Sequence, residues 1–124
     1  MVNNRARGRR IELETRNLLR GLGLLAERRD QSENADEKPD LEVRVTNPGA
    51  MAAVEVKGRK QQCSLSFLID TLQQTVEQNQ HTEHHAVVAR LDGRRPVVII
   101  TLEEWAQLFE STQHLRATQD HDMA

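Results

Sequence analysis

The sequence predicts an α/β domain, a mixed central sheet of about five strands flanked by helices on both sides. Two observations carry this prediction. Some segments alternate apolar and polar residues, which is typical of half-buried strands. Between them lie segments whose apolar residues recur every three or four positions, which is typical of amphipathic helices. In chain order they read helix, three strands, helix, two strands and helix. The chain has 124 residues, enough for one modest core, and we place this single domain in residues 1–110.

The first helix is predicted to begin near Gly8 or Arg9, after a flexible basic arm over residues 1–8, and to end near Gly21 or Gly23. Its apolar stripe follows the helical period and consists of Ile11, Thr15, Leu18, Leu19 and Leu22.

Two glutamates flank this stripe on opposite shoulders. At ~100° per residue, Glu12 and Glu14 each lie about 80° from the centre of the stripe, so either could reach a site beside the core. Glu12 also precedes Arg16 by four positions, and a surface ion pair between them is the alternative interpretation. The helical wheel leaves this choice open.

A short strand at residues 24–28 and a polar, acidic loop at residues 31–38 lead into the most informative segment, residues 39–57. In that segment two alternating runs flank the turn signal Asn47-Pro48-Gly49. This pattern predicts a β-hairpin.

Three charged residues of the hairpin can converge. Asp40 stands where the first strand begins, and Glu55 and Lys57 share one face of the second strand because side chains alternate along a strand. Two carboxylates and an ammonium group are suited to holding a hard metal ion and acting on the same oxyanion or water. Taken singly, each residue could equally be a turn-former or a member of a surface ion pair.

The second half of the domain repeats the alternation of helix and strand. A basic turn at residues 58–62 precedes a helix capped by Ser64, a strand at residues 86–91, a turn at Asp92-Gly93, and an apolar strand at residues 97–100 that should be central or well covered. The apolar face of the helix consists of Leu65, Leu68, Ile69, Leu72 and Val76.

The last predicted helix begins with the capping box Thr101-Leu102-Glu103-Glu104. Its apolar stripe, which we expect on the core, consists of Leu102, Trp105, Leu108 and Phe109. Residues 111–124 are polar, and we expect them to be frayed or disordered. His81 and His84 have a spacing that could bind a transition metal, but no further ligands cluster beside them in the sequence.

Charge, cysteine content and hydropathy limit the kinds of function that the sequence can support. The formal net charge is −2, but arginines crowd the N-terminal segment, where they could bind a phosphate backbone or form a solvated arm. The single cysteine, Cys63, excludes an internal disulfide and suits a reducing cytoplasm. No apolar run is long enough to span a bilayer.

The residues Pro39-Asp40 and, after fourteen positions, Glu55-Val56-Lys57 resemble the PD-(D/E)xK motif of restriction-endonuclease-like nucleases. The element order is similar to that family's core. Within the family, the small archaeal and phage Holliday-junction resolvases open with a glycine, a glutamate four residues later, paired leucines and another glycine. The same order and spacing are found here in Gly8, Glu12, Leu18-Leu19 and Gly23. The resemblance covers residues 5–110 and favours Glu12 over Glu14 as the active-site glutamate.

The resemblance implies roles for individual residues. Asp40 and Glu55 would bind Mg²⁺, or Mn²⁺, with the backbone carbonyl of Val56. Lys57 would act on the attacking water or the phosphate, and Glu12 would touch the metal shell through water or bind a second ion. Gln74 would be an accessory polar residue. DNA-binding residues would be Arg5, Arg7, Arg9, Arg10, Arg59 and Lys60.

The function that these expectations describe is a Mg²⁺-dependent, structure-selective DNA endonuclease of the Holliday-junction resolvase type, which leaves 5′-phosphate ends. It would act in the cytoplasm of a bacterium or phage-infected cell. We expect a homodimer, with Leu13 and the last helix as candidate contacts, because a four-way junction needs two symmetric cuts. The alternatives are a nuclease of this fold with another substrate, namely a nicking, flap, mismatch or restriction-type enzyme or an RNA-processing nuclease, and a catalytically inactive DNA-binding protein of the same fold.

Overall fold

The computed structural model describes residues 4–29, 39–45, 49–59 and 62–110, with the backbone alone for residues 4 and 5. The elements are α1 (Asn4–Gly21), β1 (Leu25–Arg28), β2 (Leu41–Arg44), β3 (Met51–Arg59), α2 (Leu65–Gln78), β4 (His84–Leu91) and β5 (Val97–Ile99). A last helix, here called the C-terminal helix, covers residues 102–110. Among all the residues that the structure describes, no helix is long and apolar enough to cross a membrane.

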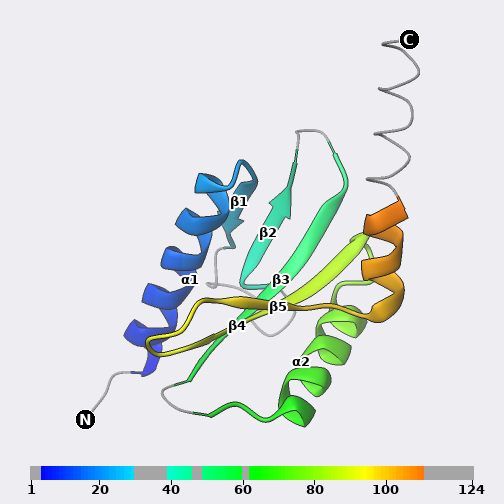
Figure 1. The fold of residues 1–124 in the computed structure, drawn as a ribbon. Coiled ribbons are helices and arrows are strands. Elements are labelled where there is room, and N and C mark those ends of the chain that lie inside the picture. Colours follow the sequence, from blue (N-terminus) through cyan, green and yellow to red (C-terminus); the bar gives the residue numbers. More distant parts are fainter. Residues whose placement is uncertain (1–3, 30–38, 46–48, 60–61, 111–124) are drawn as a thin grey trace.

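The strands form one mixed sheet in the order β1-β2-β3-β4-β5. β3 and β4 are parallel, as expected when a helix connects them, and the other neighbours are antiparallel. α1 and α2 lie on opposite sides of the sheet (Figure 1). The predicted α/β architecture and its mixed five-stranded sheet are therefore confirmed.

Each helix packs on its own half of the core. On the α1 side, Ile11 packs with Leu41, Val54, Val56 and other apolar side chains of the sheet. On the α2 side, the buried cluster consists of Leu68, Leu72, Val87 and Ala89. Alternation along β3 thus sends Val54 and Val56 toward α1 and leaves Glu55 on the other side, as the sequence predicts.

Gly58 of β3 lies against the Ile11 side chain of α1. A Cβ atom at Gly58 would collide with Cδ1 of Ile11. We expect Gly58→Ala to lower the free energy of unfolding by about 1–3 kcal/mol, the usual cost of overpacking, in urea denaturation. Ile11→Val removes Cδ1, so the double variant should be more stable than the sum of the two single effects.

Gly8 supplies the matched control for this experiment. It lies within α1, and an added Cβ would meet nothing within 4 Å. Gly8→Ala is therefore expected to stabilise the protein by roughly 0.5–1 kcal/mol. Strict additivity of Ile11→Val and Gly58→Ala would contradict the proposed contact.

α1 begins earlier than the sequence indicated. The predicted start was Gly8 or Arg9, but the helix begins at Asn4, so residues 4–8 are helical and are not a flexible arm. Arginine and alanine favour helix, and one interior glycine costs only about 1 kcal/mol. A tertiary contact offsets that cost, because Nη2 of Arg7 donates to Oδ1 of Asp92 across 3.4 Å.

α2 has the predicted cap but a different buried face. Oγ of Ser64 accepts from the amide of Phe67 at 3.1 Å, which confirms the N-cap. The buried residues are Leu68, Thr71, Leu72 and Thr75, whereas the predicted members Leu65, Ile69 and Val76 are exposed. The two threonines can be buried because each hydroxyl donates at 2.8 Å to the carbonyl four residues earlier.

β5 and the C-terminal helix are more exposed to solvent than the sequence predicts. β5 is an edge strand, and Val98 is 58% exposed, so the expected central position is wrong. The apolar stripe of the C-terminal helix is exposed too, with Leu102 at 80% and Trp105 at 56%. An apolar pattern predicts a contact, but it does not say whether the contact lies within the same chain.

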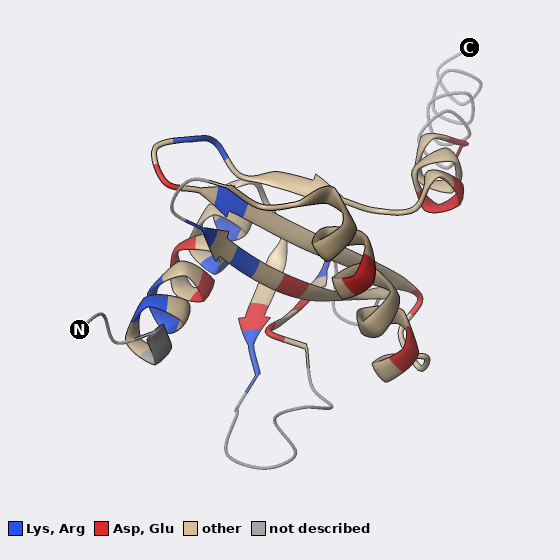
Figure 2. Cartoon of the chain, turned by 90° about the horizontal axis from the view of Figure 1, so that it is seen from below, with Lys and Arg blue, Asp and Glu red and all other residues tan. Residues whose placement is uncertain are grey.

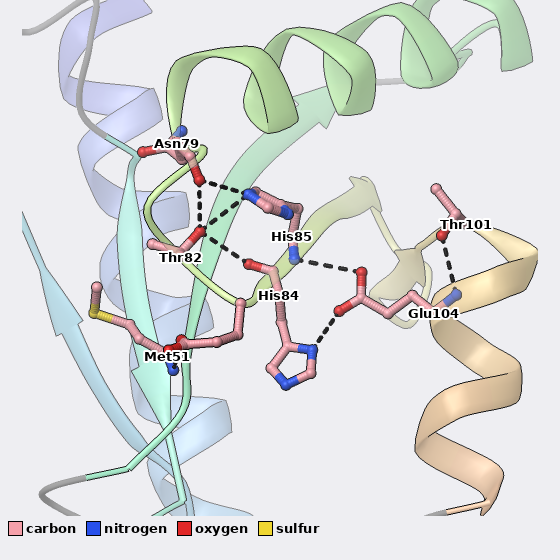
Figure 3. Close-up of polar contacts among 8 residues, drawn as sticks. Met51, Asn79, Thr82, His84, His85, Thr101 and Glu104 are labelled. Atoms are coloured by element: carbon pink, nitrogen blue, oxygen red, sulfur yellow. Dashed lines mark hydrogen bonds and ion pairs between the residues drawn. The ribbon is translucent and has the colours of Figure 1, made fainter.

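The C-terminal helix is held to the sheet through Glu104 (Figure 3). The Thr101 hydroxyl accepts from the Glu104 amide at 3.1 Å, as the capping box predicts. The Glu104 carboxylate does not return to the cap but meets Nδ1 of His84 at 2.7 Å and the amide of His85 at 3.4 Å. The His85 ring donates to the Asn79 carbonyl at 2.6 Å. His84 thus has a structural partner, and no metal site involving His81 is found among the described residues.

Candidate active site

The candidate site lies in a notch where β3 continues past the start of β2. The β2–β3 pairing starts at Leu41 and Val54, so residues 55–59 of β3 pair with β4 alone. Asp40 occupies the notch, and its Oδ2 accepts from the Val56 amide at 2.8 Å. The amide and carbonyl of one strand residue point to the same side, so the Val56 carbonyl also faces the notch.

Glu55 is the most perturbed acid of the site. Burial is the largest cause that raises its pKa, to about 8, and the neighbouring carboxyl of Asp40 adds to the effect through charge and a shared hydrogen bond. Lys57, two residues along the same face of β3, opposes the shift. Without a bound cation, Glu55 therefore keeps its proton at neutral pH.

Glu12 approaches the same centre from α1. Its Oε2 accepts from Nε of Arg28 at 2.7 Å, and both side chains are largely buried. Burial raises the pKa of Glu12, Arg28 opposes the rise, and Asp40 reinforces it. Asp40 thus interacts with both glutamates, so three acids from α1, the start of β2 and β3 share one region.

Glu14 points elsewhere. It pairs with Arg90 on β4 and, four residues back along α1, with Arg10 at 3.8 Å. The two shoulders of the helical stripe, equivalent in the sequence, are therefore distinct in the structure. Glu12 lies in the notch, and Glu14 lies in a separate ion-pair group.

A polar cleft of about 430 Å³ opens over the notch. Glu12, Asp40 and Lys57 line its interior, and Arg7 and Arg59 also contribute to its wall. Figure 2 shows that basic segments of α1, the end of β3 and the β4–β5 turn gather at this end of the sheet. The cleft therefore combines a carboxyl centre with a positively charged rim, which can attract a phosphate ester.

The donor set fits a hard divalent cation. Among the described residues, no three His, Cys, Asp or Glu side chains form a ready-made metal site. Mg²⁺, however, usually takes only one or two carboxylates and keeps several waters. Asp40, Glu55 and the Val56 carbonyl supply such a set. Burial first and the charge of Asp40 second raise the pKa of Glu55, and a bound cation would favour its ionised form.

The remaining predicted residues are distributed unevenly. Arg9 and Arg10 are exposed on α1, and the Arg59 guanidinium lies 4.7 Å from the centre of the Phe67 ring. Gln74 is exposed on α2 and does not line the cleft. Lys60 and the Arg5 side chain lie outside the described residues.

Arg28 belongs to the candidate site, although its place in the sequence does not single it out. It was assigned to a strand without a role, yet it holds Glu12 in the notch. The signal was the alternation of β1, because Arg28 shares a face with the buried Ala26, next to α1. A charged residue on a core-facing position needs a partner, and Glu12 is that partner.

Comparison with known proteins gives the fold a precedent. No protein-family model matches the chain, and no curated protein matches it. Among solved structures, the chain is similar to Hjc, a Holliday junction resolvase of the archaeal hyperthermophile Archaeoglobus fulgidus. The TM-score is 0.54 with 21% sequence identity, over 73% of each chain. This similarity confirms the restriction-endonuclease-like fold predicted from the sequence.

Proposed function

We propose that this protein is a divalent-metal-dependent DNA endonuclease that acts on branched DNA, in the manner of a Holliday-junction resolvase. The observation that carries the proposal is that Asp40 acts on both Glu12 and Glu55, next to a basic-rimmed cleft that Glu12, Asp40 and Lys57 line. Its support is the fold, which the chain shares with a protein described as a Holliday junction resolvase. Further support comes from the motif residues, because the charges of Asp40 and Lys57 both act on Glu55.

Mg²⁺ or Mn²⁺ would be held by Asp40, Glu55 and the Val56 carbonyl, with Glu12 acting through water or a second ion. When bound, the ion supplies positive charge to the scissile phosphate and acidifies a coordinated water. Asp40 is oriented for this role by the Val56 amide, which fixes one of its two oxygens. Nε of Arg28 orients Glu12 by donating a hydrogen bond to its Oε2.

Lys57 supplies a second positive charge. It lies on the same face of β3 as Glu55 and lines the cleft. An ammonium group there can stabilise negative charge that develops on the phosphate, or orient the attacking water. Arg7 and Arg59, on the cleft wall, can bind neighbouring phosphates and hold the DNA strand over the acids.

We further propose that the protein works as a homodimer. On the α1 side, an apolar cavity of about 320 Å³ lies between α1 and the C-terminal helix, lined by Leu19, Val43 and Leu108 among others. Trp105 and Phe109 are more than half exposed beside it and stack at 5.7 Å between ring centres. A second copy related by a two-fold axis would cover this surface and present two sites to one junction. Leu13 is half-buried and is the weaker candidate contact.

The decisive experiment is cleavage of labelled DNA of several shapes with Mg²⁺. We expect paired, symmetric cuts on a four-way junction, 5′-phosphate products, and no cutting in EDTA. Flap, nicked, linear duplex and single-stranded DNA, and a matched RNA, test the alternative substrates. Cutting of every DNA would retain the nuclease and remove the junction selectivity, whereas junction binding without cutting would favour an inactive DNA-binding protein.

A further inference from the structure

The turn between β4 and β5, residues 92–96, carries the exposed arginines Arg94 and Arg95. The turn has a defined conformation. Gly93 adopts a positive φ of 77°, and the Arg94 amide donates to the Leu91 carbonyl at 3.0 Å. The two arginines are therefore presented on an ordered support, which lowers the entropy lost when they bind a ligand.

This turn is joined to the wall of the cleft by two contacts. The Asp92 amide donates to the Arg59 carbonyl at 3.0 Å, and the Asp92 carboxylate accepts from Arg7 at 3.4 Å. Both Arg59 and Arg7 line the cleft. The turn is therefore joined directly to two basic residues of the cleft wall, and Figure 2 shows the basic segments of α1, the end of β3 and the turn at the same end of the sheet.

The charge balance of the turn points to an anionic partner. Its only acid, Asp92, is paired with Arg7. Within the described ranges of the chain, the side chains of Arg94 and Arg95 form no ion pair. A solvated surface turn is the ordinary interpretation of two arginines, but here they extend a rim that already leads to a phosphate-binding cleft.

The strand geometry sets the distance. At ~3.3 Å per residue, Arg59 lies about 13 Å along β3 from Glu55. The turn begins just beyond Leu91, the neighbour of Arg59 on β4, so its arginines lie on the order of 15–20 Å from the acids. Phosphates on one DNA strand advance ~3.4 Å along the helix axis, so for an arm whose axis runs along β3 this distance corresponds to about four to six nucleotides.

We propose that Arg94 and Arg95 bind the phosphate backbone of a duplex arm about four to six nucleotides from the bond that is cut. The inference rests on the proposed function and adds a second anchor to it. The first anchor, at Arg7 and Arg59, holds the strand along the cleft. The second fixes the direction in which the arm leaves the cleft.

The test is binding of a four-way junction and a linear duplex without divalent metal, at several salt concentrations. Arg94→Gln or Arg95→Gln should weaken binding about eightfold at 0.1 M salt, and the double variant about 60-fold. The slope of log affinity against log salt should fall by about 2 in the double variant. The matched control is Arg16→Gln, which should bind as wild type. Among the described residues, the Arg16 side chain forms hydrogen bonds only to Asn17.

Phosphate-ethylation interference supplies the second readout. With wild-type protein, ethylation about four to six nucleotides from the cut should reduce binding, and the double variant should lose this interference alone. If wild type binds DNA but the double variant has the same affinity and slope, the anchor is overturned while the proposed function stands. If folded wild type binds no DNA, both are overturned.

Discussion

Glu55→Gln is expected to abolish metal-dependent DNA cleavage, with a loss on the order of 10³-fold or more. The substitution keeps the shape of the protonated side chain and its hydrogen bond to Asp40, but it removes the negative charge that a divalent cation needs. Cleavage should be measured with Mg²⁺ and with Mn²⁺ on a four-way junction. Glu77→Gln, an exposed acid on α2, is the matched control and should cut as wild type.

The same variant should be more stable than wild type in EDTA at alkaline pH. The pKa of Glu55 is raised from 4.5 to about 8 in the folded state, so the unfolded chain loses this proton first as the pH rises. Wild-type stability should therefore fall between about pH 4.5 and pH 8, whereas glutamine carries no such cost. We expect the variant to gain about 2–4 kcal/mol at pH 9 and little at pH 4, in urea denaturation.

The two readouts together exclude a trivial explanation. A variant that loses cleavage because it unfolds would be less stable, and this one is expected to be more stable. Full activity in Glu55→Gln would remove Glu55 from the active centre. Unchanged stability at pH 9 would show that burial and the charge of Asp40 do not raise the pKa of Glu55 in the folded protein.

The hairpin could be predicted from sequence because its geometry is local. Side-chain alternation alone places Glu55 and Lys57 on one face of β3, and the start of β2 places Asp40 opposite them. The structure adds what alternation cannot supply, namely that β3 continues past β2 and leaves the Val56 backbone facing a notch. That feature depends on relative strand lengths, which are poorly encoded in any short window.

The buried face of α2 was misread for a physical reason. Apolarity favoured Leu65, Ile69 and Val76, but Thr71 and Thr75 are buried instead. Hydroxyls that bond to their own helix satisfy themselves, so a buried threonine costs little and a polarity scale overstates its exposure.

The exposed apolar residues of the C-terminal helix raise a related point. Helical periodicity identified the stripe that contains Trp105 and Phe109, but it carries no information about which surface covers the stripe. In the proposed homodimer that surface belongs to a second chain. The pattern then predicts an interface, but it does not say that a second copy of the chain covers it.

The choice between Glu12 and Glu14 is the sharpest test of the site. Glu12→Gln is expected to lower cleavage on the order of 100-fold, because it removes a charge beside Asp40 while its amide oxygen can still accept from Arg28. Glu14→Gln removes partly exposed ion pairs with Arg90 and Arg10, each worth about 0–1 kcal/mol, and should stay within about threefold of wild type.

The comparison is controlled by its own design, since both changes are isosteric and lie two residues apart on one helix. Thermal unfolding should show both variants folded, and metal titration followed by isothermal titration calorimetry should show weaker binding for Glu12→Gln alone. Equal losses in the two variants would mean that α1 supports the site only through its packing. A larger loss for Glu14→Gln would move the active centre toward Arg90 and β4, on the face of the sheet covered by α1, and would contradict the site built around Asp40.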